Sequence, residues 1–183
     1  MNIKENFKVL FRDLDISAIK SAILESSRSD WDENKIRQIA FPHVAGHTET
    51  LILKFNGPTQ SINHPSKTKT FDAWSKWEGL LNPVIDRLRT LYPNSTISKC
   101  MFPKLFAGGV ISKHIDNGDD LTLVHRIHVP IITNEDTIFT CGGEEINMKE
   151  GCAYEINNQR LHGVVNNGKT DRVHLLIDLY CDG

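Results

Sequence analysis

The sequence predicts a single domain that is mainly β, with helices flanking a closed antiparallel sandwich or jelly roll. Its second half holds eight short candidate strands within about 85 residues, separated by turn-forming residues. Its first half alternates instead between helical and extended patterns. A chain of 183 residues is long enough to bury a core of its own, and no repeat or Gly/Ser-rich linker divides it.

The first elements that we expect are a helix over about residues 15–28 and a strand over 47–55. Asp13 or Asp15 can cap the helix. Apolar residues then fall on one helical face: Ile16, Ile19, Ile23 and Leu24. In HTETLILKF (47–55) the apolar residues alternate, which is typical of a strand. The polar segment 56–70 follows, and we expect it to be a loop bordering a functional site.

Residues 70–91 carry apolar side chains at helical spacing, beginning with Trp74 and Trp77. Asn82-Pro83 lies in the middle of this stretch, and Pro after an Asn cap is typical of a first helical turn. We therefore expect two short helices or one kinked helix. The tryptophans are expected in the core rather than in a ligand site.

From residue 97 onward the sequence predicts strands. They are expected over 97–102, 105–112, 121–132, 136–141, 144–148, 152–157, 162–166 and 172–180. Turn signals separate them at Gly108-Gly109, Asn117-Gly118, Gly142-Gly143 and Asn167-Gly168.

The charge balance and the cysteines limit the class of protein. With 21 basic and 23 acidic residues the net charge is −2, which argues against a general nucleic-acid binder. No apolar run approaches the roughly 20 residues that a membrane span needs, and the N-terminus shows no secretory signal. The four cysteines are Cys100, Cys141, Cys152 and Cys181. They form no CxxC pair and are expected to be reduced, mostly buried thiols of a cytoplasmic protein.

The strongest chemical feature is His114-Ile115-Asp116, at the end of an expected strand. Residues i and i+2 of a strand point to the same side, so His114 and Asp116 can reach one metal ion together. His162 is the best candidate for a third ligand. Two imidazoles and a carboxylate on one face of an octahedron leave three positions open, as in non-heme Fe(II) oxygenases. The alternative is a surface His and Asp near a turn.

Ionisable residues inside two apolar strands support a functional cavity. Arg126 and His128 share one face of the strand 121–132, while Arg172 and His174 share one face of the last strand. Burying an arginine is costly unless its charge is paired. A guanidinium binds a carboxylate through two parallel hydrogen bonds, so Arg172 can hold a dicarboxylate in the cavity of the metal. For Arg126, the alternative is a structural pair with an acidic neighbour.

The other histidines have simpler interpretations. His43 and His47 lie four residues apart in a non-helical segment, which is poor ligand geometry, so we expect substrate-pocket or surface roles. His64 is expected at the surface, and His125 is expected to be packed or hydrogen-bonded away from the cavity. His174 either lines the cavity or is a hydrogen-bonded core histidine.

The segments HID, RIHVPI, YEINNQRLHGVVNN and DRVHLLIDLY resemble the aspartyl/asparaginyl β-hydroxylase family of Fe(II)- and 2-oxoglutarate-dependent dioxygenases. The resemblance covers about residues 97–180. It implies a double-stranded β-helix, a cupin-like jelly roll, in which 96–183 form the core and 1–95 the flanking region of one domain, 1–183. It also implies hydroxylation of an unactivated C–H bond, coupled to oxidative decarboxylation of 2-oxoglutarate by O2 to succinate and CO2.

Residue roles follow from the resemblance. His114 and His162 match the two iron-binding histidines, and Arg172 matches the arginine that pairs with the distal carboxylate of 2-oxoglutarate. Arg126 and His128 match a strand motif that contacts this cosubstrate. Asp116 departs from the best-known animal enzymes, which have glycine there. Those enzymes bind iron with two histidines, whereas here a carboxylate is present, so a full triad of His114, Asp116 and His162 is the simpler interpretation. The carboxylate also argues against halogenation, because related halogenases leave that ligand position open to chloride.

Three functions compete at this point. The resemblance favours a hydroxylase that acts on an aspartyl or asparaginyl residue of a peptide, or on a free amino acid. A cupin-like metalloenzyme that does not use 2-oxoglutarate would leave Arg172 and Arg126 without a dicarboxylate to explain them. A non-catalytic jelly-roll binding module predicts the loss of one metal ligand, whereas all three candidates are present.

Overall fold

The computed structural model describes residues 3–56, 64, 65 and 67–181. One set of strands comprises β1 (Phe7–Phe11), β2 (Thr48–Phe55), β3 (Lys69–Thr70), β4 (Thr96–Leu105), β6 (Val124–Ile132), β9 (Ala153–Ile156) and β11 (Arg172–Tyr180). A second set comprises β5 (Val110–His114), β7 (Thr137–Cys141), β8 (Glu144–Ile146) and β10 (His162–Asn166). The helices are α1 (Ser17–Leu24), α2 (Arg28–Asp32), α3 (Ile36–Ala40), α4 (Pro42–Ala45), α5 (Trp74–Arg89) and α6 (Asp119–Thr122).

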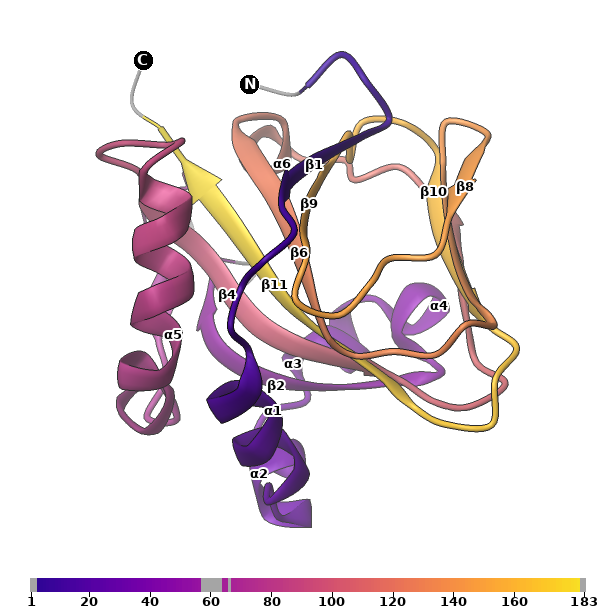
Figure 1. Cartoon of the computed structure of the whole chain (residues 1–183), viewed down its shortest axis with the longest axis horizontal. Helices are drawn as coiled ribbons and strands as arrows, with labels where there is room; N and C mark the ends of the chain where they lie inside the picture. Colours follow the sequence, from indigo (N-terminus) through magenta and orange to yellow (C-terminus); the bar gives the residue numbers. More distant parts are fainter. Residues whose placement is uncertain (1–2, 57–63, 66, 182–183) are drawn as a thin grey trace.

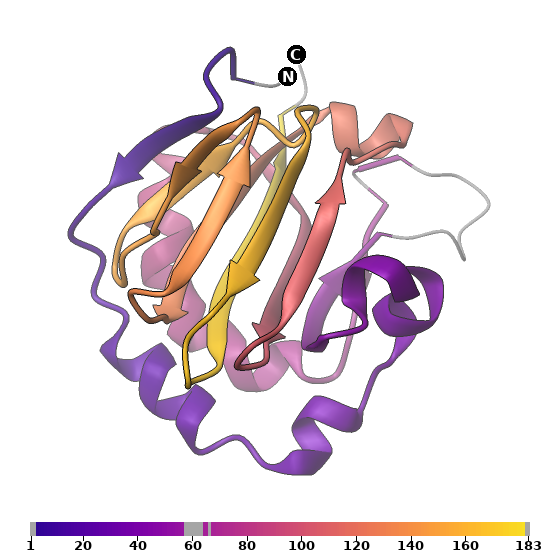
Figure 2. The same ribbon diagram turned by 90° about the vertical axis from the view of Figure 1, so that its right-hand side faces the viewer.

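The strands form two antiparallel sheets that make opposite walls of the molecule (Figure 1). The large sheet has the order β1-β9-β6-β11-β4-β2-β3, and the small sheet has the order β5-β10-β7-β8. In Figure 2 the small sheet faces the viewer, with α3 and α4 beside its β5 edge. The expected mainly β jelly roll with flanking helices is confirmed, although the large sheet also recruits β1, β2 and β3 from the first half of the chain.

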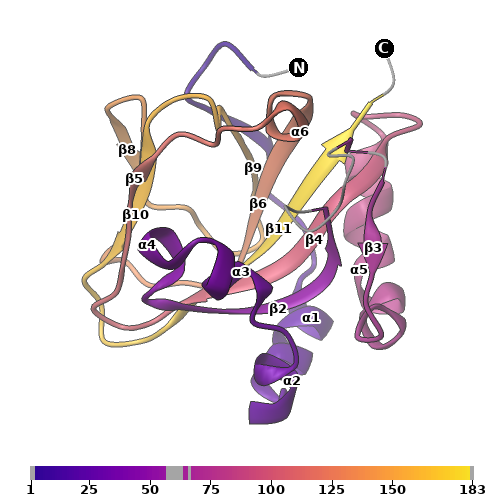
Figure 3. The ribbon, with the colours of Figure 1, turned by 180° about the vertical axis from the view of Figure 1, so that it is seen from behind.

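The main apolar core lies on the outer face of the large sheet, beneath α1 and α5 (Figure 3). On β6, Ile127, Val129 and Ile131 are fully buried in this core. Because strand side chains alternate, Arg126 and His128 point the other way, between the two sheets. The alternation seen in the sequence thus separates a hydrophobic face from a polar face that lines the interior.

Within residues 70–91 the chain forms one continuous helix, α5 (Trp74–Arg89), with Pro83 inside it. Of the two alternatives expected from the sequence, the single helix is therefore the one observed, and two short helices with a start at Asn82-Pro83 are excluded. A proline ring disturbs the carbonyl four residues earlier, which here belongs to Gly79. A side chain at Gly79 would meet nothing within 4 Å, so this turn of α5 is unobstructed and exposed to solvent. Packing of Trp77, Leu81 and Leu88 into the core keeps the helix intact.

Most expected strands are confirmed, with two main boundary corrections. The run 105–112 is not one strand, because β4 continues to Leu105 and β5 begins only at Val110. The chain turns at Gly109, where a Cβ would lie 2.8 Å from the carbonyl oxygen of Phe106. Residues 121 and 122 belong to α6 rather than to β6. The expected helix 15–28 is shorter, as α1, and part of the expected loop, 57–63 and 66, lies outside the described residues.

The short elements α2, α3, α4, β1 and β3 have no counterpart in the sequence-based prediction, and β3 lies within the expected loop 56–70. Among the described helices, none is long and apolar enough to cross a membrane. All four cysteines are free thiols, and three of them, Cys100, Cys141 and Cys152, are buried as expected.

Candidate metal and cosubstrate site

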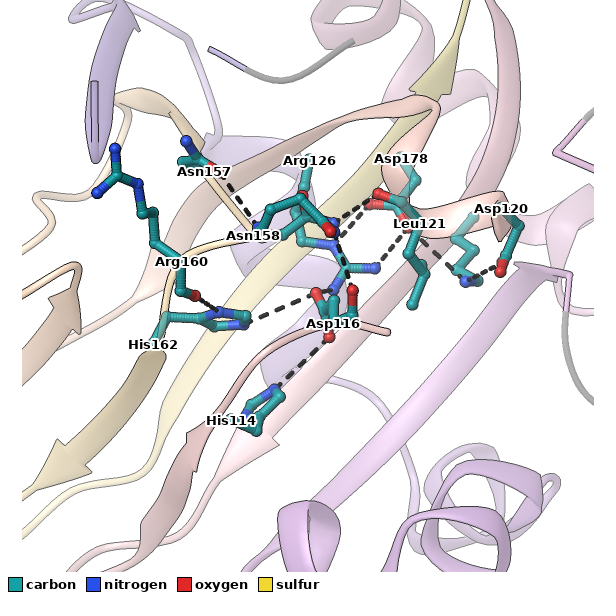
Figure 4. A network of polar contacts seen from close by, with 12 residues as sticks. His114, Asp116, Asp120, Leu121, Arg126, Asn157, Asn158, Arg160, His162 and Asp178 are labelled. Carbon is teal, nitrogen blue, oxygen red and sulfur yellow. Dashed lines mark hydrogen bonds and ion pairs between the residues drawn. The ribbon is translucent and has the colours of Figure 1, made fainter. Parts of the chain in front are cut away.

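Three potential metal ligands converge between the two sheets (Figure 4). His114 ends β5 and His162 begins the neighbouring β10, where the two residues are directly paired. The carboxylate of Asp116 lies 3.7 Å from Nε2 of His114 and 3.7 Å from Nε2 of His162. The three donor atoms all lie within 4.8 Å of one another. Neighbouring ligands of an octahedral ion are about 3 Å apart, so this arrangement suits one metal ion.

Backbone hydrogen bonds fix the protonation of both imidazoles. Nδ1 of His114 lies 2.7 Å from the carbonyl oxygen of Ser112, and Nδ1 of His162 lies 2.9 Å from that of Arg160. A carbonyl only accepts, so each Nδ1 carries the proton and donates it. In the neutral imidazole this leaves the lone pair on Nε2, the atom that faces Asp116, which is the tautomer that a metal-binding histidine requires at this site.

The backbone of Asp116 is held by the segment that precedes β10. Its N–H donates to the carbonyl of Asn158 at 3.1 Å, and its carbonyl accepts from Nε2 of Gln159 at 2.8 Å. Nδ2 of Asn158 in turn donates to the carbonyl of Leu121 at 2.9 Å. The loop that leads into His162 thus also positions the third ligand.

A row of alternating charges crosses the large sheet behind Asp116. Arg126 on β6 faces Asp178 on β11, which faces Lys99 on β4. Nε and Nη2 of Arg126 donate to the two oxygens of Asp178 at 2.8 and 2.7 Å, and Nη1 donates to Asp116. Lys99 lies 3.0 Å from Asp120 and 4.0 Å from Asp178. Each of these buried charges therefore has a partner of opposite sign.

The pKa of Asp116 reflects this surrounding charge. Burial raises the pKa of the carboxyl group, but Arg126, and then His162 and His114, outweigh burial and hold the pKa below its usual range. The carboxylate is therefore ionised at neutral pH, as a metal ligand must be. Burial lowers the pKa of His162, which favours the neutral, metal-binding imidazole.

Arg172 is the buried cation of the site that has no carboxylate partner among the described residues. Its side chain is only 1% exposed, and its one hydrogen bond runs from Nη2 to Nδ1 of His174 at 2.7 Å. Burial, together with the charge of Arg37, lowers the pKa of Arg172 to about 9. Nε of Arg172, Nε2 of His174 and Nδ1 of His128 are buried without any hydrogen-bond partner. A polar ligand in the cavity could supply the hydrogen-bond partners that these three atoms lack.

Two adjoining cavities surround these groups. The smaller, of about 50 Å³, is lined by the two candidate metal ligands His114 and His162 together with Arg126, His128 and Arg172. The larger, of about 390 Å³, is lined by His114, Asp116 and Arg126, and further by Lys99 and Asp120. Every candidate site residue expected from the sequence thus lines one or both cavities: His114, Asp116, His162, Arg126, His128 and Arg172.

Several residues of the site were missed by the sequence analysis. Lys99 is a charged residue in a mostly apolar, mostly buried strand, and this pattern could have identified it as a candidate site residue. Arg37 and Asp120 lie on short helices that show no sequence pattern. Nothing in the sequence places Arg37 of α3 against strands that follow more than sixty residues later along the chain.

The remaining histidines lie away from the metal ligands or serve the framework. Nδ1 of His47 accepts the N–H of Val110, and Nδ1 of His125 lies 2.6 Å from Glu155 on the core side. His64 packs edge-on against the ring of Tyr180. The side chain of His43 lies outside the described part of the chain.

Solved structures with the same fold are numerous but distant in sequence. An oxidoreductase of the 2OG-Fe(II) oxygenase family from Burkholderia pseudomallei is 10% identical, covers 93% of this chain and 94% of its own, and superposes with a TM-score of 0.59. A prolyl-4-hydroxylase from Pseudomonas putida is 14% identical over 98% and 95% of the two chains, with a TM-score of 0.54.

A viral collagen prolyl hydroxylase from Paramecium bursaria Chlorella virus-1, in a 2OG complex, is 10% identical over 98% of both chains, with a TM-score of 0.56. At these identities the similarity establishes the fold alone. No curated protein sequence matches the chain.

The profile of one protein family, described as Aspartyl/Asparaginyl beta-hydroxylase, matches residues 80–181. The matched segment is more than half of the 183 residues and contains every expected site residue. It begins within α5 and therefore leaves out α3 and α4. The chain belongs to the aspartyl/asparaginyl β-hydroxylase family, which confirms the expected class of enzyme, an Fe(II)- and 2-oxoglutarate-dependent oxygenase.

Proposed function

We propose that this enzyme hydroxylates an aspartyl or asparaginyl residue of a peptide, or a free amino acid, and releases succinate and CO2. The observation that carries the proposal is one cavity lined both by two paired histidines whose Nδ1 atoms are held by backbone carbonyls and by a buried arginine that has no carboxylate partner among the described residues. The first feature suits a metal ion and the second suits a dicarboxylate.

His114, Asp116 and His162 are the residues that would hold Fe(II). They supply two nitrogen donors and one oxygen donor from one side, which leaves the opposite side open for other ligands. The bound iron would supply activation of O2, coupled to decarboxylation of 2-oxoglutarate. Arg126 keeps the carboxylate of Asp116 ionised and oriented while it is itself held by two bonds to Asp178.

Arg172 would hold the distal carboxylate of 2-oxoglutarate. Its Nε has no partner, so a carboxylate could accept from this atom and from a terminal nitrogen at the same time. His174 orients the guanidinium through Nδ1, because arginine can only donate and that nitrogen must accept. His128, with a buried and unpartnered Nδ1, is placed to contact the cosubstrate as well. Contact of Arg126 with the cosubstrate stays a prediction.

The larger cavity would receive the substrate that is hydroxylated. It adjoins Asp116 and His114, and its volume of about 390 Å³ suits one amino acid or one side chain of a peptide. Its wall is partly apolar, with Phe41, Phe55 and Leu121, and partly charged. We further propose a reducing, cytoplasmic compartment, which is supported by the four free thiols.

An anaerobic titration tests the cofactor chemistry. Purified metal-free protein is loaded with Fe(II) and then titrated with 2-oxoglutarate, while the visible charge-transfer band of the chelate is followed. We expect a band in the wild type, none in the His162→Ala variant, and a markedly raised dissociation constant for 2-oxoglutarate in Arg172→Ala. The exposed Arg89→Ala variant on α5 is the matched control and should behave as the wild type.

The outcome decides between the competing functions. Formation of succinate in air, together with the band, supports the 2-oxoglutarate-dependent hydroxylase. Iron binding without a band and without succinate would move the cupin-like metalloenzyme to first place. Failure to bind iron, by a protein that unfolds cooperatively, would favour a binding module.

A further inference from the structure

Arg37 lies at the junction of the two cavities. It is the one residue from the first 40 positions that lines both of them, and it comes from α3, outside the segment that the family profile matches. Its side chain is half-buried. Burial, and then the charge of Arg126, lowers the pKa of Arg37 to about 10, whereas Asp116 raises it, so the guanidinium lies close to the metal ligands and stays charged at neutral pH.

The contacts of Arg37 position it but do not neutralise it. Nη1 donates to the hydroxyl oxygens of Thr48 and Thr50 on β2, at 3.1 and 3.4 Å. The neighbouring Gln38 donates to the carbonyl of Thr48 and to the hydroxyl of Thr50, both at 3.3 Å, which fixes α3 on the same strand. Within the described ranges, no carboxylate lies within ion-pair distance of Arg37.

A count of formal charges isolates Arg37 as the unbalanced cation. The site contains Arg37, Lys99, Arg126 and Arg172, against three carboxylates, Asp116, Asp120 and Asp178. Burial, and then the positive charge of Arg172, holds the pKa of His128 and of His174 well below the usual range, so both are neutral. Bound Fe(II) adds two positive charges and 2-oxoglutarate removes two. One positive charge therefore remains in the loaded site.

The other cations already have partners in that state. Lys99 pairs with Asp120, Arg126 pairs with Asp178, and Arg172 would hold the cosubstrate. A buried charge without a partner is destabilising, and a planar guanidinium selects a carboxylate in preference to a neutral amide. The larger cavity supplies room for that carboxylate and for the rest of the molecule that bears it.

We propose that Arg37 binds a carboxylate of the substrate that is hydroxylated, and that it thereby selects an aspartyl side chain over an asparaginyl one. The inference rests on the proposed function, in which the substrate is either an aspartyl or an asparaginyl side chain; the two differ in the one negative charge of aspartate. Arg172 lines only the smaller cavity and would already hold the cosubstrate there, whereas Arg37 also lines the larger cavity and can meet a carboxylate of the substrate.

Direct binding to the metal-loaded protein tests the assignment without turnover. Protein carrying Zn(II) and 2-oxoglutarate is titrated with two matched pairs of probes: L-aspartate and L-asparagine, and their N-acetyl amides. We expect the aspartate member of at least one pair to bind about tenfold or more tightly than its asparagine partner. Arg37→Gln should abolish that preference, Arg37→Lys should retain part of it, and the exposed Arg89→Gln on α5 should leave it unchanged.

The affinity for 2-oxoglutarate and the thermal midpoint are measured on every variant. A preference lost in Arg37→Gln, with cosubstrate affinity within about twofold of the wild type, supports the proposal. Equal binding of both members of each pair, or no binding of either aspartate at millimolar concentration, overturns it. Weakened 2-oxoglutarate binding in Arg37→Gln also overturns it, because Arg37 would then serve the cosubstrate.

A wild type that does not bind 2-oxoglutarate would refute the proposed function separately. The probes are in that case titrated against the protein loaded with Zn(II) alone. An aspartate preference that depends on Arg37 would then still support the role of this residue, and its absence would refute that role too. Should Arg37→Gln fail to fold, the comparison of Arg37→Lys with the wild type decides.

Discussion

Substituting Asp178 with asparagine should destabilise the protein by about 3 kcal/mol. Asp178 is fully buried and accepts hydrogen bonds from Nε and Nη2 of Arg126 at 2.8 and 2.7 Å. Asparagine has nearly the same shape but offers only one oxygen, and its amide group would face an N–H of the guanidinium. The change therefore removes a negative charge from between Arg126 and Lys99 and leaves one hydrogen bond unmade.

The magnitude follows from these contacts. Removing one member of a buried ion pair costs roughly 3–5 kcal/mol, because the remaining charge stays buried. In the Asp178→Asn variant, Arg126 still has Asp116 as an ion-pair partner and Lys99 still has Asp120, so the lower end of that range applies. In a chain of this length, about 3 kcal/mol lowers the midpoint of thermal unfolding by roughly 6–12 °C.

The assay is equilibrium urea unfolding of the metal-free protein at pH 7, supported by a thermal scan. The matched control is Asp86→Asn on α5, where the carboxylate is 71% exposed and lies 3.6 Å from Arg89. The control should change the free energy of unfolding by at most about 0.5 kcal/mol. A loss below about 1 kcal/mol in Asp178→Asn would refute the claim that the row of charges is energetically coupled.

Three further changes test other parts of the structure. Burial, and then the charge of Arg172, lowers the pKa values of His128 and His174, so both enter the fold neutral. As the pH falls from about 6.5 to 5, the unfolded chain binds from about one to almost two more protons on these residues than the folded chain, so the free energy of unfolding should fall with a slope that rises toward about 2.7 kcal/mol per pH unit. Urea unfolding between pH 6.5 and 5 measures that slope, which His174→Gln should reduce by about half; an unchanged slope contradicts the assignment. Gly163→Ala places a Cβ 2.8 Å from the carbonyl oxygen of Ile111, which should push β5 away from β10 and weaken Fe(II) binding about tenfold or more in a titration. The control Gly79→Ala, whose Cβ would meet nothing within 4 Å, should leave Fe(II) binding unchanged, and equal affinities in both variants would argue against a shared metal site on the two strands. Pro83→Ala should raise the free energy of urea unfolding by about 1 kcal/mol or more, because it restores a helical hydrogen bond to the carbonyl of Gly79. The exposed Asn82→Ala variant is the control, and no gain in Pro83→Ala would mean that α5 already compensates for the missing hydrogen bond.

The elements of the β core could be predicted because their signals are local. Alternation on the last strand separates Arg172 and His174 from Val173 and Leu175, and the structure places these two sets on opposite faces of β11. The spacing of His114 and Asp116 likewise predicts a shared direction, although Asp116 lies two residues beyond the end of β5. Neither inference needed knowledge of any distant segment.

The errors arose where distant packing overrides a local signal. Asn82-Pro83 has the chemistry of a helix start, which is why two short helices stood beside one kinked helix as an alternative. The two short helices are excluded because the apolar residues on both sides of Pro83 pack on one sheet face and hold α5 continuous. The strand expected over 105–112 was divided by the close approach of Phe106 to Gly109, which the composition of the run does not reveal. Propensity differences are small beside the burial of several core side chains.

By itself, the sequence determined the class of fold, the six candidate residues of the site and, through its resemblance, the family. Only the tertiary structure decided that Arg126 is held by Asp178 and Asp116, that Arg172 has no carboxylate partner among the described residues, and that Arg37 meets both cavities. The physical reason is that residue type and spacing specify the direction of a side chain along one element. Whether a charge finds a partner depends on which elements the fold brings together.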